Sequence, residues 1–124
     1  VISGAGTGLT TPVSLWLDKA SDTLYVSGYY GSQTITIFNN ASSINGNVSP
    51  SRRIIGGTTG LSWPCGLWLD PSTDSLYVTN VGSNSLRVFS GASTIDGNVA
   101  PSRVIAGGNT GFSWPTDIWL DTNP

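Results

Sequence analysis

Short apolar runs separated by turn-forming residues occupy the chain from end to end. In its middle part, residues 66–69, 75–79, 85–89 and 103–106 are four such runs, rich in Leu, Val, Ile and aromatic residues. Asp, Pro, Ser, Asn and Gly separate the first three runs, and a longer connection over residues 90–102 leads to the fourth. The runs are too short for helices and too closely spaced for helical crossovers between parallel strands. They therefore predict a four-stranded antiparallel meander.

The same pattern occurs more than once along the chain. Residues 15–18, Leu-Trp-Leu-Asp, recur at 67–70, an offset of 52. The first copy carries one extra residue at 29–31, and from there the offset is 51. A third copy begins with Gly-Phe-Ser-Trp-Pro at residues 111–115 and reaches Trp-Leu-Asp before the sequence stops. Self-similarity at such a period is typical of stacked repeat architectures.

Four short strands in about 50 residues, repeated around an axis, are typical of a β-propeller. We therefore predict an all-β fold, a β-propeller built from four-stranded antiparallel blades of about 51 residues. Residues 8–59 are the first blade repeat, 60–110 the second, and 111–124 the start of a third. Residues 1–7 align with the end of a repeat and are predicted to be a fourth-strand remnant of a preceding blade. The chain is thus expected to hold two complete blades plus flanking strands.

Two blades cannot close a ring, because propellers typically have about four to eight. We expect either that the sequence is a portion of a longer chain or that copies in a homo-oligomer supply the further blades. An open pair of blades would expose apolar faces and unpaired strand edges.

Composition narrows the chemistry that this chain can perform. It has no His, no Glu and no Met, one Lys, one Cys and a net charge of −2. Without histidine, imidazole acid–base catalysis, Ser-His-Asp triads and His-ligated metals are excluded for this chain. The lone Cys65 excludes an internal disulfide and is expected to be a small buried hydrophobe. Five cations against seven anions do not favour nucleic-acid binding, and no apolar run approaches the roughly 20 residues that span a bilayer.

Three segments of the second copy resemble the NHL repeat and the related YVTN repeat of bacterial and archaeal β-propellers. They are residues 64–70 (Pro-Cys-Gly-Leu-Trp-Leu-Asp), 76–80 (Leu-Tyr-Val-Thr-Asn) and 84–89. The connection over residues 92–103 resembles that of a subclass found in large secreted or surface-associated bacterial proteins. The resemblance implies a propeller with an extracellular or cell-surface location. It says less about activity, because propellers of this kind bind proteins, bind glycans, act as lactonases or lyases, or serve as structural arrays.

The resemblance also implies where a ligand would bind, at the loops that enter the first strand and those that join the second strand to the third. Asp117 is the charged residue just after a repeat proline, and Asn80 could assist it. Together they fall short of the several oxygen ligands that Ca²⁺ takes, so no metal and no cofactor are expected. Asp117 could equally cap a local turn.

Trp63 and Trp114 are the second candidates for ligand binding. Both precede a repeat proline, where the first copy has Thr11. An aromatic ring beside Asn, Ser and Thr is the composition of a sugar-binding shelf; the alternative is a ring packed over the proline and the next blade.

Tryptophan also stands at the centre of every first strand, where NHL repeats usually carry a small residue. Trp16, Trp68 and Trp119 are expected to fill the space between adjacent blades, or alternatively to line the central channel.

The function expected from these observations is a non-catalytic binding or structural scaffold that mediates protein interaction or surface assembly. A lectin-like, glycan-binding propeller is the alternative, followed by a lactonase- or lyase-type enzyme. The expected partners are a protein or a glycan, with no nucleic acid and no membrane insertion.

Overall fold

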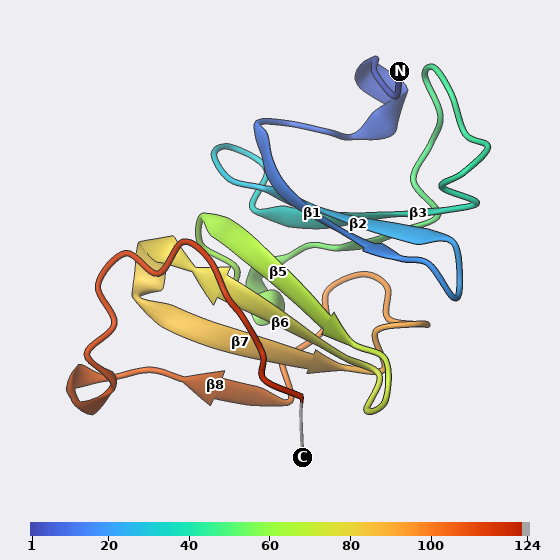
Figure 1. The fold of residues 1–124 in the computed structure, drawn as a ribbon. Helices are drawn as coiled ribbons and strands as arrows, with labels where there is room; N and C mark the ends of the chain where they lie inside the picture. The colour runs from blue at the N-terminus through green and yellow to red at the C-terminus, as the bar shows by residue number, and fades with distance from the viewer. Residues whose placement is uncertain (123–124) are drawn as a thin grey trace.

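The computed structural model describes residues 1–122 and is all-β (Figure 1). Two four-stranded antiparallel sheets follow one another, each with its strands in chain order. The first contains β1 (Pro12–Asp18), β2 (Thr23–Gly28), β3 (Thr34–Asn39) and β4 (Arg52–Ile54). The second contains β5 (Pro64–Asp70), β6 (Ser75–Asn80), β7 (Ser85–Ser90) and β8 (Arg103–Ile105). Residues 1–122 also hold four single turns of 3-10 helix. They are η1 (Ala5–Thr7) before β1, η2 (Gly57–Thr59) and η3 (Val81–Ser83) between strands, and η4 (Gly108–Thr110) after β8. The prediction of two four-stranded meanders is confirmed.

Recurrent aspartates hold the connections between strands. In the second sheet, the carboxylate of Asp70 accepts hydrogen bonds from the hydroxyls of Ser72 and Thr73, at 2.7 and 2.8 Å, and so closes the β5–β6 turn. Asp74, in the same turn, accepts both the amide and the hydroxyl of Ser93 at the start of the long β7–β8 connection. A short polar side chain that bonds nearby backbone groups is suited to such turns.

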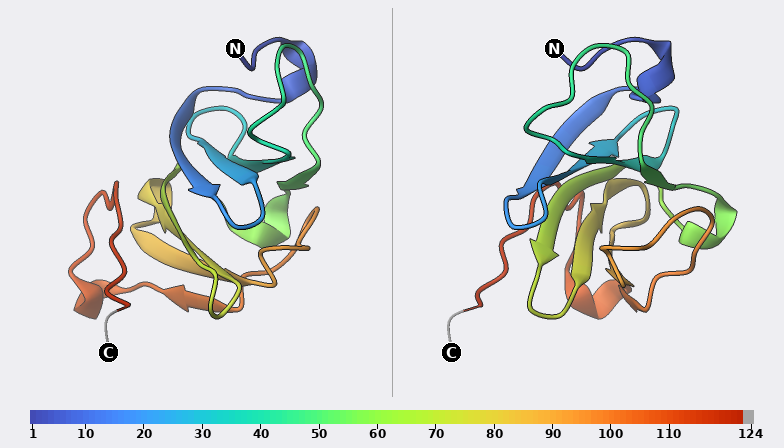
Figure 2. Two further views of the ribbon diagram at one scale, coloured as in Figure 1. Left: turned by 45° about the vertical axis from the view of Figure 1, so that its right-hand side comes forward. Right: turned by 90° about the vertical axis from the view of Figure 1, so that its right-hand side faces the viewer.

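The hydrophobic core lies between the two sheets, which are stacked one on the other (Figure 2). The first strands of the two sheets, β1 and β5, are neighbours in this stack. The first sheet contributes Tyr25, Ile35, Ile37 and Ile54, and the second contributes Leu61, Leu67, Leu69, Leu76, Val78, Phe89 and Ala92. Because these residues come from both sheets, neither sheet has this core on its own.

The N-terminal segment does not form the predicted strand. Ile2 makes an isolated parallel bridge with Gly46, just as Ile54 bridges Gly97 in the next repeat. The amide of Ser3 donates to the carbonyl of Gly46 at 3.1 Å, and Ile55 repeats this bond with Gly97 at the same length. The segment therefore lies against the first sheet as the end of β4 lies against the second. Strand β4 pairs with β3 in an antiparallel ladder. The N-terminal segment has no such partner, so its single bridge does not extend into a strand.

The third copy does not form its first strand either. Residues 115–122 follow an irregular path, and residues 123 and 124 of this predicted repeat lie outside the described residues. Strands β1 and β5 each pair with the strand that follows them. In the described part of the chain no strand follows residues 115–121, so this segment has no ladder to join.

Candidate functional site

Both first strands begin at a proline, and the residue before that proline bends the chain in the same way in every copy. Thr11, Trp63 and Trp114 have φ values of 46°, 51° and 53°, in the left-handed region that bulky residues rarely adopt. The carbonyls of Thr11 and Trp63 accept the amides of Tyr29 and Val81, at 3.0 and 3.2 Å. The bend thus joins the entry of each first strand to the loop between the second and third strands.

Trp63 meets two tyrosines from the first sheet. Its ring centroid lies 5.8 Å from that of Tyr29 and 5.8 Å from that of Tyr30, with interplanar angles of 40° and 37°. Trp63 is half-buried, whereas Tyr30 is 62% exposed. Neither tyrosine was among the predicted site residues. The one-residue difference between the copies at 29–31 was the sequence signal that marked them.

Trp114 occupies the same loop position in the third copy but has different surroundings. It is 65% exposed, and its amide donates to Oδ1 of Asn84 at 2.8 Å. Its ring contacts no other aromatic ring within residues 1–122. The two tryptophans predicted to bind ligand are therefore not equivalent.

Asn80 is a structural residue and not part of an exposed site. Its side chain is 0% exposed. Oδ1 accepts the amide of Ser62 at 2.7 Å, and Nδ2 donates to the Gly60 carbonyl at 3.0 Å and to the Ser83 hydroxyl at 2.7 Å. The Asn80 amide thus joins the end of β6 to the segment before β5. Because its polar atoms are buried and bonded within the protein, it does not lie where a surface ligand would bind.

Asp117 lies at the surface beside β5. Its Oδ1 accepts the amide of the next residue, Ile118, at 2.8 Å, which is the local cap considered as the alternative role. The backbone of Asp117 passes so close to Gly66 that a Cβ there would lie 2.8 Å from the Asp117 Cα, which accounts for the glycine. Burial raises the pKa of the half-buried Cys65 thiol, and the charge of Asp117 raises it further. The thiol therefore stays protonated at neutral pH.

Trp16 of β1, Trp68 of β5 and Trp119 at the equivalent position of the third copy form a row of tilted and edge-on ring contacts across the repeats. The rings of Trp16 and Trp68 are 4.4 Å apart between centroids, and those of Trp68 and Trp119 are 4.7 Å apart. Trp16 packs against the core between the sheets. Trp16 and Trp68 are half-buried in this row, whereas Trp119 is 80% exposed. Both expectations, rings that fill the space between blades and rings that line a central channel, therefore stay predictions.

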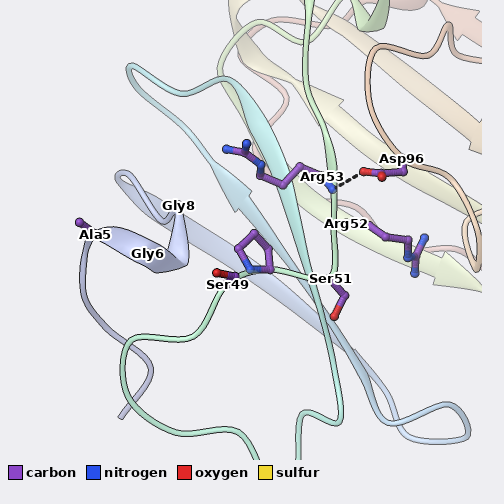
Figure 3. A pocket seen from close by; sticks show the side chains of 9 residues that line it. Ala5, Gly6, Gly8, Ser49, Ser51, Arg52, Arg53 and Asp96 are labelled. Carbon is purple, nitrogen blue, oxygen red and sulfur yellow. Dashed lines mark hydrogen bonds between the residues drawn. The ribbon is translucent and has the colours of Figure 1, made fainter.

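A cavity of about 490 Å³ lies between η1 and β4 (Figure 3). The side chain of Arg53 extends toward Gly8 on its wall, and the amide of Arg53 donates to Oδ1 of Asp96 at 2.9 Å. Arg52 points the other way and donates to backbone carbonyls of the second sheet. The cavity lies at a junction between repeats, because η1, β4 and Asp96 of the β7–β8 connection all line it.

Neither a metal centre nor a membrane-spanning helix is found in residues 1–122. No three Cys or Asp side chains gather there as metal ligands, and no helix there is long and apolar enough to cross a membrane.

No known protein family and no curated protein matches this sequence. The repeat geometry and the exposed side chains are therefore the guides to function.

Proposed function

We propose that this chain is part of an NHL/YVTN-type β-propeller and serves as a non-catalytic scaffold that mediates protein interaction or surface assembly. The observation that carries the proposal is the open apolar face of the first sheet. Leu67 and Leu69 of β5 are 4% and 3% exposed beneath the first sheet. Their counterparts in β1, Leu15 and Leu17, are 62% and 43% exposed.

The outer face of the second sheet also exposes apolar side chains. Ile54 is fully buried against the second sheet, whereas its counterpart Ile105 is 39% exposed, and the neighbouring Val104 is also exposed. Contiguous exposed apolar surface marks sites of interaction with other protein. Further blades, from the same polypeptide or from other copies of it, would cover both faces as the two sheets cover each other.

Two side chains with reactive groups support a role without catalysis. The thiol of Cys65 is held protonated, and the thiolate is the nucleophilic form of cysteine. The carboxylate of Asp117 is engaged with its own neighbour. An extracellular or cell-surface setting, with a protein partner, belongs to the same proposal and rests on the resemblance of the repeats.

The mass of the native particle tests the scaffold proposal. We expect sedimentation equilibrium of the native protein to give a discrete species several times heavier than 12.9 kDa, as one long chain or as several copies. If copies assemble, Leu15→Asp should shift the equilibrium toward monomer, because a charge on the covered face is costly. Lys19→Asp, in the exposed turn between β1 and β2, is the control and should leave the equilibrium unchanged. A monodisperse 12.9 kDa monomer at every concentration would overturn the proposal.

A further inference from the structure

The cluster of Tyr29, Tyr30 and Trp63 is an aromatic surface that neither sheet needs for its own core. The tyrosines come from the β2–β3 loop and the tryptophan from the segment before β5. We call these three residues the aromatic shelf. The ring of Tyr30 is largely exposed, and Trp63 is held in the left-handed region, where a bulky residue is unfavourable.

The two loops that carry the shelf also line a cavity of about 280 Å³. Ser32 and Gln33 line it from one loop and Leu61 from the other, with residues 55–57 completing the wall. This volume lies just below the range for small-molecule sites, about 300 to 1,000 Å³, and the three rings of the shelf do not line the cavity.

Unused hydrogen-bonding groups lie on the shelf itself and on the β2–β3 loop that carries its tyrosines. Within residues 1–122, the side-chain amide of Gln33 and the hydroxyls of Tyr29 and Tyr30 make no hydrogen bond. Gln33 and Tyr30 are exposed, so these groups can reach a ligand. No charged residue belongs to the shelf or to the lining of the cavity. Apolar rings with a few uncharged donors and acceptors are the usual lining of a site for a neutral small molecule.

We propose that the aromatic shelf binds a neutral pyranose unit of a glycan. The apolar face of a pyranose ring, made of C–H groups, packs on an aromatic face, and its hydroxyls bond amides and phenols. In this arrangement Trp63 and Tyr30 carry the stacking, and the Gln33 amide bonds the ring hydroxyls. The site is independent of the scaffold function, since it uses no residue of the two open blade faces.

The chain contains its own control for this site. Trp114 repeats the position and the backbone conformation of Trp63, with φ of 53° against 51°. The loop that corresponds to the two tyrosines is residues 81–83, Val-Gly-Ser, which supplies no aromatic ring. Trp114 therefore has an exposed indole without a shelf, and it should contribute little to sugar binding.

Isothermal titration of the native protein with soluble hexasaccharides tests the proposal. The probes are cellohexaose, xylohexaose, mannohexaose and chitohexaose. We expect at least one to bind with a Kd of about 0.1 to 1 mM, the weak range of a single shallow site. Trp63→Ala and Tyr30→Ala should each weaken binding by about tenfold or more, and Gln33→Ala by about tenfold, whereas Trp114→Ala should change it less than about twofold.

Three results would overturn the glycan site. One is the absence of saturable binding for all four probes up to about 10 mM. Another is binding that survives Trp63→Ala and Tyr30→Ala. The third is an equal loss in Trp63→Ala and Trp114→Ala. If Trp63→Ala fails to fold, Tyr30→Ala and Gln33→Ala decide, because both side chains are exposed and absent from the core. The particle mass is unaffected by these outcomes, so the scaffold proposal stands or fails separately.

Discussion

The two sheets carry nearly the same sequence and differ in what covers them. Both first strands contain Leu-Trp-Leu-Asp, yet the leucines of β5 are buried and those of β1 are exposed. The tyrosine of the second strand shows the reverse: Tyr25 is buried between the sheets, and Tyr77 is half-buried on the open side of the second sheet. Burial in this molecule is therefore set by the neighbouring repeat and not by the sequence of the strand.

Polar contacts between the sheets also depend on whether a neighbouring repeat is present. The Arg52 guanidinium reaches across to the carbonyls of Ala92 and Ile95, with its Nη1 at 2.8 and 3.0 Å from them. Its counterpart Arg103 has no third sheet beside it within residues 1–122, and donates to the Tyr77 hydroxyl at 3.1 Å within its own sheet. Arg52 therefore joins the two repeats, and Arg103 makes no such contact in the described part of the chain.

The largest expected effect comes from truncating matched leucines. Leu69→Ala should lower the free energy of unfolding by about 2 to 5 kcal/mol, because it leaves a cavity in the core between the sheets. Leu17→Ala, at the corresponding exposed position, should cost less than about 1 kcal/mol when measured at low protein concentration. Urea denaturation of both variants measures the difference. Equal losses in the dissociated 124-residue polypeptide would mean that Leu17 is as deeply buried there as Leu69, which would contradict their exposures of 43% and 3%.

A smaller effect is expected from the two arginines. Arg52→Ala removes hydrogen bonds from a charged donor and should cost about 1.5 to 3 kcal/mol. Arg103→Ala should stay within about 0.5 kcal/mol of the parent, as for other exposed substitutions. The same denaturation experiment gives both values. A loss in Arg103→Ala as large as that in Arg52→Ala, measured on the dissociated 124-residue polypeptide, would show that stabilisation by this arginine does not depend on a neighbouring repeat.

The smallest effect concerns pH and the turn that closes β5. Hydrogen bonds from Ser72 and Thr73 hold the pKa of Asp70 below its usual range. The folded state therefore favours the carboxylate more than the unfolded state does. This contribution is fully present above the ordinary pKa of about 3.9 and is lost as pH falls through the lower folded value.

Asp70→Asn should remove that part of the acid sensitivity. Thermal unfolding midpoints of the parent and the variant, recorded between about pH 6 and pH 2, should converge as the pH falls. Parallel curves over that range would show that Asp70 adds nothing to the pH dependence.

The strands could be predicted from the sequence because their signals are local. Apolar runs and Asp-rich turns identify the four strands of each sheet within one or two residues, and the repeat offset correctly aligns Ile2 with Ile54. The flanking strands were wrong, since a strand needs a partner that no local pattern supplies. Residues 115–121 repeat the sequence of β5 but have no second strand beside them.

The candidate site was less predictable, because its parts come together only in three dimensions. Asn80 is polar and lies at a strand end, which favours an exposed position, yet the segment before β5 folds over it and uses both ends of its amide. Trp63 was identified, but the tyrosines that make it a shelf lie more than 30 residues away, on another sheet. No spacing rule connects the two loops.

Hydroxyl-radical footprinting of the native particle tests the central claim most directly, namely that a further repeat covers each open face. If a further repeat covers the open face of the first sheet, Leu15 and Leu17 should be protected from oxidation as strongly as Leu67 and Leu69. Oxidation of Leu15 and Leu17 at the rate of exposed leucines, with Leu67 and Leu69 protected, would contradict it.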